Sequence, residues 1–459
     1  MTTLFSELDF DTATLANLDS LGYREMTPIQ AQALPPLLSG QDLIGQAKTG
    51  SGKTVAFGLA LLQTIDRRHF STQALVLCPT RELADQVAKE LRRLARGHAN
   101  TKILTLCGGS PFGPQLASLE HGAHVIVGTP GRILKHLRKQ SLDLSGLRIV
   151  TLDEADRMLD MGFHDDMVTI LSETPRQRQT LLFSATFPEG IRELSAAFQN
   201  KPVEVTIEEE AGELAIEQRF YEVEKQSRLE SLVALLAEQK PASCVVFCNT
   251  RQDCQDVGDL LKQRGLSALA LHGDLDQWER DQVLVRFANK SISVLVATDV
   301  AARGLDIKEL EAVINLELPR DPEVYVHRIG RTGRAGKSGL ALSLFTPAEV
   351  GRLTAIEDYL GVTTVQHSAP ETGGDIRPEL TPPMSTLSVD GGRKQKLRPG
   401  DLLGALTANN AIPAGKVGSI DIFDNATYVA VESSLARKAL KVLSDGNIKG
   451  RRFRVRHIR

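Results

Sequence analysis

The stretch "DLIGQAKTGSGKT", residues 42–54, joins a short apolar run to a glycine-rich segment that ends in Lys-Thr. The apolar run predicts a β-strand, and a helical pattern begins directly after the glycines. A glycine-rich turn between a strand and a helix presents backbone N–H groups and the helix N-terminus to phosphate. The stretch therefore predicts a phosphate-binding loop in a parallel α/β sheet, with a chance match to a short pattern as the alternative.

Each position of this loop is a candidate nucleotide contact. The candidates are Ala47, Lys48, Thr49, Gly50, Ser51, Gly52, Lys53 and Thr54. Lys53 is expected to reach the outer phosphates, and the Thr54 hydroxyl is expected to bind Mg²⁺. The general pattern begins with Gly, and this chain has Ala47 in that place.

The alternation of strand and helix continues on the C-terminal side of the loop. Strand-like runs include "ALVLCP", "HVIVGT", "LRIVTLD" and "TLLFSA", with helical patterns such as residues 81–96 between them. After the acidic stretch "TIEEEAGELAIEQ" the alternation restarts with "QRFYEV", "SCVVFC" and "ISVLVATD". Strands separated by helices pair in parallel with right-handed crossovers. The sequence thus predicts two RecA-like parallel-sheet domains, residues 1–206 and 214–365.

A different pattern follows the second sheet. Residues 366–383 include the proline-containing stretch "SAPETGGDIRPELTPP" and are expected to form a linker. Residues 384–459 predict the order βαββαβ, which is a small α+β fold used by RNA-recognition modules and by many unrelated domains. This last segment carries 14 Lys and Arg against 6 Asp and Glu, whereas the whole chain has a net charge of −3.

The composition indicates an ordinary soluble protein, because 42% of its 459 residues are hydrophobic and 24% are charged. No apolar run approaches the length of a membrane span, and the first residues lack a signal-peptide pattern, so a cytoplasmic location is expected. Five cysteines lie mostly in strand-like runs and are expected to be reduced core residues: Cys78, Cys107, Cys244, Cys248 and Cys254.

Two acidic residues follow a buried strand in "LRIVTLDEAD", about a hundred residues beyond the loop. At the carboxyl edge of a parallel sheet, Asp153 and Glu154 are expected to share the crevice of the phosphate loop. Asp153 would then bind Mg²⁺ together with Thr54, and Glu154 would position or deprotonate an attacking water. Considered alone, the acidic pair could equally be an exposed turn.

The stretch "HRIGRTGRAG", residues 327–336, supplies cations near the end of the second domain. Arg331 and Arg334 are candidates to stabilise charge that develops on the γ-phosphate, as arginine fingers do. On this hypothesis hydrolysis needs residues from both domains. The alternative is a basic loop that only binds nucleic acid.

These motifs together resemble the DEAD-box RNA helicases over residues 1–365. Further matching stretches, in the family's order, are "GYREMTPIQ", "PTRELA", "CGG", "TPGR", "SAT", "VVFCNT", "QWER", "ATDVAARGLD" and "HRIGRTGR". The initial Ala47 of the loop is usual in this family, whereas Met26 stands where many members have Pro. The resemblance implies an RNA-dependent ATPase and helicase that uses ATP and Mg²⁺ and acts on RNA.

Site residues carry over by position. Gln30 resembles the adenine contact, supported by Phe5 and Tyr23, and Asp306 resembles the ribose contact. The element that links hydrolysis to strand separation is matched by Ser184 and Thr186, with Asp156 and His327 as its partners. Positions that hold the RNA backbone in the family are matched by Arg81, Gly109, Thr129, Arg132, Gln277, Arg280, Thr298, Asp299 and Arg303.

Residues 384–459 resemble the RNA-binding domain of bacterial helicases of the DbpA type. That resemblance implies large-subunit ribosomal RNA, or pre-ribosomal particles, as the partner. Candidate RNA contacts are the basic residues Lys449, Arg451, Arg452 and Arg454, together with Arg393, Lys394, Lys396, Arg398 and Arg456. Tyr428 and Phe423 are the aromatic residues near the central strands, and either could belong to the core instead. A basic tether without RNA specificity is the alternative.

Two other functions stay open at this point. One is an ATP-gated RNA clamp whose strand separation is incidental, and the other is a general helicase of messenger-RNA metabolism. A monomer without membrane contact is expected in each case. The RNA preference of the basic domain would distinguish a ribosomal from a general role.

Overall fold

The computed structural model describes residues 3–47, 50–207, 216–302, 310–333, 339–369 and 380–458. The chain divides into two compact units, the first reaching to residue 210 and the second made up of nearly all later residues. Within the units lie two parallel sheets and a small antiparallel sheet, which confirms the predicted fold class.

The first unit contains a seven-stranded parallel sheet in the order β3-β4-β2-β5-β6-β1-β7. Its strands are β1 (Leu43–Gln46), β2 (Ala74–Leu77), β3 (Ile103–Leu106), β4 (Val125–Gly128), β5 (Ile149–Asp153), β6 (Gln179–Ser184) and β7 (Val203–Thr206). The central strands are buried along their length, as expected for a parallel sheet covered on both faces.

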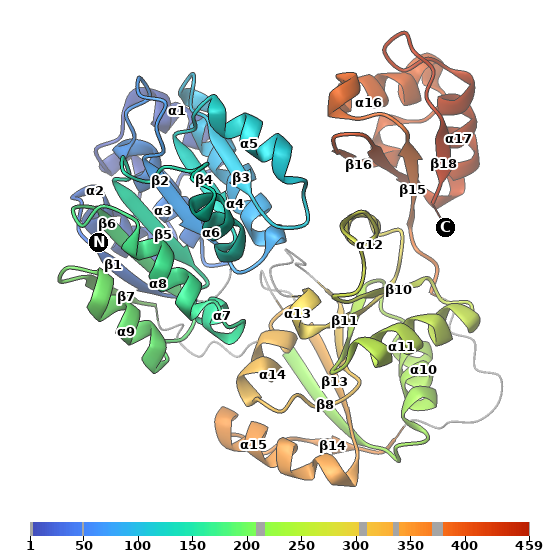
Figure 1. Ribbon diagram of the computed structural model, residues 1–459. Helices are drawn as coiled ribbons and strands as arrows, with labels where there is room; N and C mark the ends of the chain where they lie inside the picture. Colours follow the sequence, from blue (N-terminus) through green and yellow to red (C-terminus); the bar gives the residue numbers. More distant parts are fainter. Residues whose placement is uncertain are drawn as a thin grey trace. The chain divides into compact units, whose positions relative to one another are not determined.

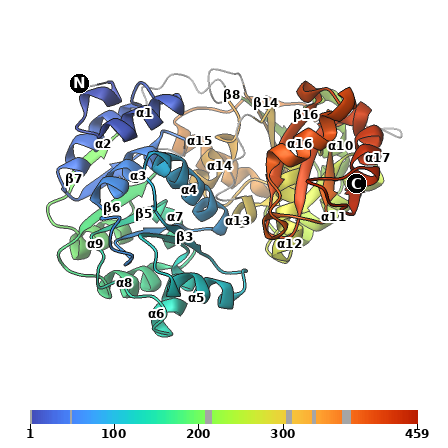
Figure 2. The same cartoon turned by 90° about the horizontal axis from the view of Figure 1, so that it is seen from above.

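Alternate residues of each strand enter different core clusters. Val76 and Val127 pack with α1 (Thr12–Ser20), α2 (Pro28–Leu38), α3 (Lys53–Thr64) and α4 (Arg81–Leu94). Leu77 and Ile126 pack on the other face with α6 (Pro130–Arg138), α7 (Ala155–Asp160), α8 (His164–Ser172) and α9 (Glu189–Phe198). Figure 2 shows α2 and α3 on one side of this unit and α6 and α8 on the other. Helix α5 (Phe112–Glu120) follows β3.

The second unit repeats this topology, with strand order β10-β11-β9-β12-β13-β8-β14. Its strands are β8 (Ile216–Glu222), β9 (Cys244–Cys248), β10 (Ala268–Leu271), β11 (Val294–Thr298), β12 (Ala312–Asn315), β13 (Gly339–Phe345) and β14 (Gln366–His367). The helices are α10 (Arg228–Gln239), α11 (Arg251–Gln263), α12 (Gln277–Ala288), α13 (Asp299–Ala302), α14 (Pro322–Ile329) and α15 (Val350–Leu360). Figure 1 shows α10 and α11 on one face of this sheet and α14 and α15 on the other.

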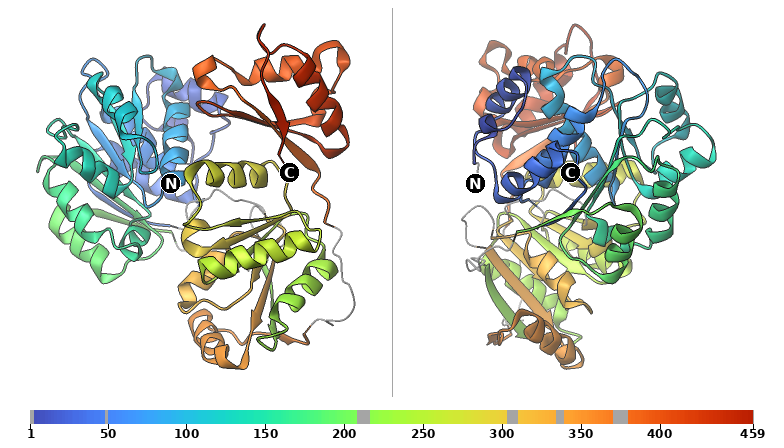
Figure 3. Two further views of the ribbon diagram at one scale, coloured as in Figure 1. Left: turned by 45° about the vertical axis from the view of Figure 1, so that its right-hand side comes forward. Right: turned by 90° about the vertical axis from the view of Figure 1, so that its left-hand side faces the viewer.

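The C-terminal domain has the predicted order βαββαβ. Its elements are β15 (Met384–Val389), α16 (Pro399–Thr407), β16 (Val417–Ile422), β17 (Thr427–Glu432), α17 (Ala436–Asp445) and β18 (Val455–His457). The sheet is antiparallel in the order β16-β17-β15-β18, and both helices pack on one of its faces (Figure 3). The final strand is shorter than the predicted "RRFRVRHI" and starts only at Val455.

The opposite face of this small sheet packs against the end of α12. The Thr386 hydroxyl lies 2.7 Å from the Ser291 hydroxyl, and the Met384 N–H donates to the Lys290 carbonyl over 3.3 Å. Tyr428 points to the same face and is only 2% exposed. Of the two uses considered for Tyr428, the structure favours the core residue, because it lies on the face of the small sheet that packs against α12.

All five cysteines are free and buried. Burial raises the pKa of each thiol, to about 12 for Cys107 and Cys244. The expectation of reduced core cysteines is therefore confirmed. Within the ranges that the structure describes, no helix combines the length and apolar character needed to cross a membrane.

Candidate functional site

Three strand ends come together at the carboxyl edge of the first sheet. In the parallel register Gln46 at the end of β1 is paired with Ser184 at the end of β6, and Asp153 at the end of β5 is paired with Phe183. The Ala47 N–H donates to the Ser184 carbonyl over 3.1 Å. The phosphate loop, the acidic pair and the Ser-Ala-Thr segment, which lie far apart in the sequence, therefore form one site.

The loop itself depends on two glycines in the left-handed region. Gly50 has φ +91° and Gly52 has φ +97°. A Cβ atom on Gly52 would lie 2.4 Å from Nε2 of Gln30, so the close approach of Gln30 requires glycine there. Lys48 and Thr49 lie outside the described residues.

Gln30 makes both of its side-chain contacts at this place. Its Nε2 donates to the Gly52 carbonyl over 3.1 Å, and its Oε1 accepts from the Thr27 N–H over 2.8 Å. The candidate adenine contact is thus fixed against the phosphate loop. Phe5 is buried in the same core cluster as α3, and the Tyr23 hydroxyl donates to Glu90 over 3.0 Å.

Lys53 is the first residue of α3 and is only 6% exposed. Its Nζ donates to the Ala47 carbonyl over 2.6 Å, which directs the ammonium group across the mouth of the loop. Asp153 is fully enclosed, and burial raises the pKa of its carboxyl to about 7, although the charge of Lys53 opposes the shift. The neighbouring acids Glu154 and Asp156 add to the rise. A buried, crowded carboxylate of this kind is stabilised by a cation.

The donor set fits Mg²⁺, which prefers oxygen ligands and binds through few carboxylates and substrate phosphates. Asp153 offers a carboxylate, and Thr54 is the second residue of α3, directly after Lys53. Glu154 is the N-cap residue of α7 and has φ +52° and ψ +53°, a left-handed conformation that is uncommon outside glycine. Its carboxylate lies 3.5 Å from the Arg157 guanidinium. This strained turn places two acids in succession at the sheet edge, which argues against the exposed acidic turn.

Asp156 ties the acidic turn to the segment after β6. Its Oδ2 accepts from the Ala185 N–H at 3.0 Å, from the Thr186 N–H at 2.9 Å and from the Thr186 hydroxyl at 3.1 Å. The Asp156 N–H in turn donates to the Ser184 hydroxyl over 3.2 Å. The contacts that the resemblance implied for Ser184 and Thr186 with Asp156 are present.

The chain is 55% identical over 455 residues to the ATP-dependent RNA helicase DbpA of Escherichia coli, and the match covers 99% of each chain. The chain belongs to the DEAD-box ATP-dependent RNA helicases of the DbpA type. Family models agree: DEAD/DEAH box helicase over residues 27–194, Helicase conserved C-terminal domain over 224–336 and DbpA RNA binding domain over 386–457.

Helicases of lower identity match this chain over most of its length but not over all of it. The DEAD-box ATP-dependent RNA helicase CshA of Bacillus cereus is 46% identical over 356 residues, which are 77% of this chain and 68% of that one. Among solved structures, S. cerevisiae Dbp5 bound to RNA and ADP BeF3 is 31% identical and has a TM-score of 0.72. That match covers 80% of this chain and 96% of the Dbp5 chain.

In the second unit of this DEAD-box helicase, Arg328 organises the edge of the sheet. It is buried, and its guanidinium binds both carboxylate oxygens of Asp299 at 2.6 and 2.7 Å. It also donates to the Glu317 carbonyl and to the side chains of Asn315 and Asn249. His327 and Arg331 were predicted site residues, but Arg328 was not, because its place in "HRIGR" gives no sign of burial.

Asp299, a candidate RNA contact, is thus also the partner of a buried arginine. Arg280 lies on α12 and donates to the Ala301 carbonyl over 2.8 Å, and Gln277 donates to Asp281 over 2.7 Å. Thr298 ends β11, and Arg331 follows α14, which contains His327. The predicted residues Arg303, Asp306 and Arg334 lie outside the described residues.

The RNA-binding candidates of the first unit meet at the loop after β3. Arg81 donates to the Gly108 carbonyl over 3.1 Å, and Arg132 donates to the Ser110 carbonyl over 3.1 Å. A Cβ atom on Gly109 would lie 1.4 Å from Arg81, so glycine is required for this contact. Thr129 is the N-cap residue of α6, three positions before Arg132. The structure therefore brings all four candidates of this unit into one region.

Two polar residues behind this region were missed. The Gln115 Oε1 accepts from Arg132 over 2.6 Å, and its Nε2 donates to the Cys107 carbonyl over 3.0 Å. His136 Nε2 lies 3.1 Å from the same Gln115 oxygen. Because that oxygen can only accept, His136 is protonated at Nε2. Its Nδ1 lies 2.9 Å from the Ser141 hydroxyl, which also donates to the His136 carbonyl. Burial, with help from Arg132 and Lys135, lowers the pKa of His136 to about 4.

The basic residues of the C-terminal domain form an exposed edge. The exposed residues include Lys449, Arg451, Arg452, Arg454 and Arg456 around the last strand, and Arg393, Lys394 and Arg398 before α16. Lys449 is positioned by a hydrogen bond of 2.7 Å to the Lys396 carbonyl, and Arg456 binds Asp390 at 2.6 Å.

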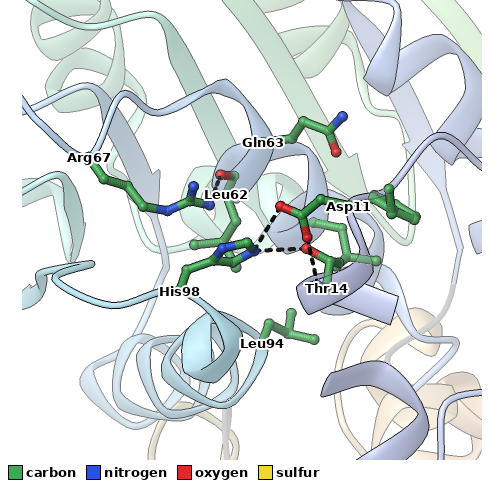
Figure 4. Close-up of a pocket in the computed structure, with 9 residues that line it drawn as sticks. Asp11, Thr14, Leu62, Gln63, Arg67, Leu94 and His98 are labelled. Carbon is green, nitrogen blue, oxygen red and sulfur yellow. Dashed lines mark hydrogen bonds and ion pairs between the residues drawn. The ribbon is translucent and has the colours of Figure 1, made fainter. Parts of the chain in front are cut away.

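A separate cavity of about 140 Å³ lies at the far end of α3 (Figure 4). His98 Nε2 lies 2.8 Å from the Thr14 hydroxyl and 3.6 Å from the Asp11 carboxylate, which joins α1 to the end of α4. Burial, followed by the charge of Arg67, lowers the pKa of His98. A space of this volume holds a few water molecules and is too small for a nucleotide.

Proposed function

We propose that this DEAD-box helicase remodels structured ribosomal RNA during assembly of the large ribosomal subunit. The observation that carries the proposal is the exposed basic edge around β18, on a domain that matches the DbpA RNA binding domain. Because Tyr428 is buried against α12, selective RNA contacts are left to this edge and its loops rather than to base stacking on the sheet. A cytoplasmic monomer remains part of the proposal.

The catalytic roles follow from the site at the first sheet. Lys53 and the backbone N–H groups of the loop hold the outer phosphates of ATP, and Asp153 with Thr54 holds Mg²⁺. A Mg²⁺ ion held there would supply positive charge beside the phosphate groups. Glu154 orients the attacking water and accepts its proton. Arg331 of the second unit, with Arg334, is proposed to stabilise the developing charge.

RNA is gripped without reading its sequence. Arg81 and Arg132 offer guanidinium groups beside the Gly109 backbone, which suits phosphate and sugar contacts on one strand. The Dbp5 structure bound to RNA and ADP BeF3 supports this role for a related pair of domains. Asp156 links this function to hydrolysis, since it joins the acidic turn to Ser184 and Thr186.

The test measures steady-state ATP hydrolysis by the full chain with total ribosomal RNA and with an unrelated RNA of equal mass. We compare the parent with the triple variant Arg451→Ala, Arg452→Ala and Arg454→Ala. A matched control removes three exposed charges from α17: Arg437→Ala, Lys438→Ala and Lys441→Ala. Both variants change the net charge of the domain equally.

The proposal predicts stronger stimulation of the parent by ribosomal RNA, a preference lost in the β18-edge variant and kept in the α17 control. Equal stimulation of the parent by both RNAs would instead indicate a general helicase with a charged tether. Strand release and the lifetime of bound RNA, measured with a non-hydrolysable ATP analogue, separate a helicase from a clamp.

A further inference from the structure

An aromatic side chain surrounded by cations lies beside the RNA candidates of the first unit. Phe112 is the first residue of α5 and is partly exposed. Three cationic groups lie near the centroid of its ring: the Lys135 ammonium at 5.5 Å, the Lys139 ammonium at 5.6 Å and the Arg132 guanidinium at 6.0 Å. Both lysines are exposed: Lys135 lies on α6, and Lys139 is the C-cap residue of that helix, about one turn later.

The ring is held in a defined orientation by a buried partner. The His136 imidazole stacks on Phe112 with centroids 4.2 Å apart and planes at 16°. His136 is itself fixed between Ser141 and Gln115, as described above. One face of Phe112 is thus occupied by a rigid, neutral ring, while the partly exposed side chain keeps further surface accessible.

The position of Phe112 continues the region that grips RNA. The loop that receives Arg81 at Gly108 and Arg132 at Ser110 runs through Pro111 directly into Phe112. Gln115 on the same helix holds the Arg132 guanidinium. An RNA strand that contacts Arg81 and Arg132 therefore passes within reach of the Phe112 ring.

We propose that Phe112 is a stacking platform for one unpaired RNA base and that Lys135 and Lys139 bind the phosphates beside that base. Aromatic rings in a positively charged surface bind single strands in this way, because every base offers a π-face and every nucleotide a phosphate. The lysines that lie near the ring in the free protein would move to the phosphates when the base stacks. The inference deepens the RNA-binding role proposed above and rests on it.

A surface aromatic that only packs is the competing explanation, and the same unit provides a control. Phe70 is 51% exposed and also lies against a histidine, His124, with centroids 4.6 Å apart. It precedes β2, and His124 precedes β4, so this pair is at the amino edge of the sheet. The carboxyl edge carries the RNA candidates, so Phe70 should not touch RNA.

The experiment uses the full chain, a non-hydrolysable ATP analogue and a labelled single-stranded oligouridylate. A series of this RNA carries one abasic nucleotide at successive positions. We expect Phe112→Leu to weaken binding of intact RNA by roughly 5- to 150-fold, the range for one stacked base. Phe70→Leu should leave the affinity unchanged. At one abasic position the RNA affinity of the parent should fall by the same factor, whereas the RNA affinity of the Phe112→Leu variant should fall no further.

The lysines are tested independently of the ring. The double variant Lys135→Ala, Lys139→Ala should show a shallower slope of log affinity against log salt. The decrease in slope should correspond to the loss of about one to two phosphate contacts. An unchanged slope would contradict the phosphate contacts of the lysines. The platform would be refuted if Phe112→Leu matched Phe70→Leu, or if its loss were the same at every abasic position.

Failure of the inference and failure of the helicase assignment give different results. If the parent protein shows RNA-stimulated ATP hydrolysis and Phe112→Leu binds as the parent does, the platform is wrong and the RNA-binding role stands. If the parent itself neither binds the oligouridylate nor is stimulated by RNA, the RNA-binding role fails first.

Discussion

The two parallel sheets have the same strand order, yet the corresponding helix start is used in opposite ways. In the first unit α3 begins with Lys53, whose ammonium binds the Ala47 carbonyl and lies close to Asp153 at the end of β5. In the second unit α10 begins with Arg228. Its guanidinium binds Glu317, just after β12, at 2.9 Å and also binds Glu349.

The same strand order can thus be combined with a helix start that faces a glycine loop or with one that is covered by acidic side chains of the protein. Arg228 and Glu349 are 8% and 6% exposed, so the protein's own carboxylates occupy the place opposite the cation. In the first unit Lys53 instead lies beside the Ala47 carbonyl and the Asp153 carboxyl. The two helix starts therefore differ in how far the protein's own carboxylates pair with the cation.

The largest expected effect comes from the acidic turn of the first sheet. Glu154→Gln should lower the rate of ATP hydrolysis by about 10²–10⁴-fold, since a positioned general base contributes that much. ATP-dependent RNA binding should persist because the loop and Lys53 are untouched. Both are measured on the purified full chain, with hydrolysis by phosphate release. Hydrolysis at the parent rate would remove the assigned role of Glu154.

Removing the cation at the start of α10 in the second unit should lower the stability of the fold and should not change the hydrolysis reaction. Arg228→Ala leaves Glu317 and Glu349 without their buried partner and should cost about 3–5 kcal/mol of unfolding free energy. Urea denaturation of the full chain measures this loss in the unfolding transition of the second unit. The rate of ATP hydrolysis per folded molecule should change little. A loss of hydrolysis at full stability would mean that the second sheet takes part in the reaction directly.

The exposed ion pair between Arg251 and Asp274 serves as the matched control for that variant. Its atoms are 2.7 Å apart, and both side chains are more than half exposed. Arg251→Ala should cost less than about 1 kcal/mol, because solvent screens such pairs. Equal losses for Arg228→Ala and Arg251→Ala would contradict the claim that burial makes the difference.

The two units should also differ in how pH changes the free energy of unfolding. The first unit buries His136 as a neutral side chain, whereas the second unit buries the charged Arg328. The pKa of His136 is about 4 in the fold, against about 6.5 in an unfolded chain. Between these pH values His136 binds a proton in the unfolded chain but not in the folded one. The free energy of unfolding therefore falls as pH decreases from 6.5 towards 4. The loss should be about 1–2 kcal/mol at pH 5.

Denaturation at pH 7.5 and pH 5 checks this expectation. In His136→Gln the difference in unfolding free energy between the two pH values should shrink by that amount. An identical pH response of parent and His136→Gln would exclude His136 as its source.

Much of this site could be predicted because parallel strands place their carboxyl ends at one edge. The loop after Gln46, the acids after Leu152, and Ser184 each lie at the carboxyl end of a strand, so their proximity needs only the sheet topology. The side-chain partners could not be predicted in this way. Arg228 and Glu349 are 121 residues apart, and hydrophobic periodicity says which face is buried but not which charge meets which.

The same limit applies to the C-terminal domain. The order of its elements was predicted, and alternation placed Tyr428 on one face of β17. Its burial depends on α12 of another domain, which no local pattern contains. His136 could have been noticed only as a histidine within a basic helix, where a solvent-exposed residue is the ordinary expectation.

The hydrogen bonds of Gln30 bear on the predicted contact with adenine. Its Nε2 is bonded to the Gly52 carbonyl and its Oε1 to the Thr27 N–H. A side-chain amide has two N–H donors and two acceptor lone pairs, so one donor and one acceptor site remain for a base. On the hypothesis that Gln30 contacts adenine, the two backbone bonds fix the direction of these remaining sites before a nucleotide arrives.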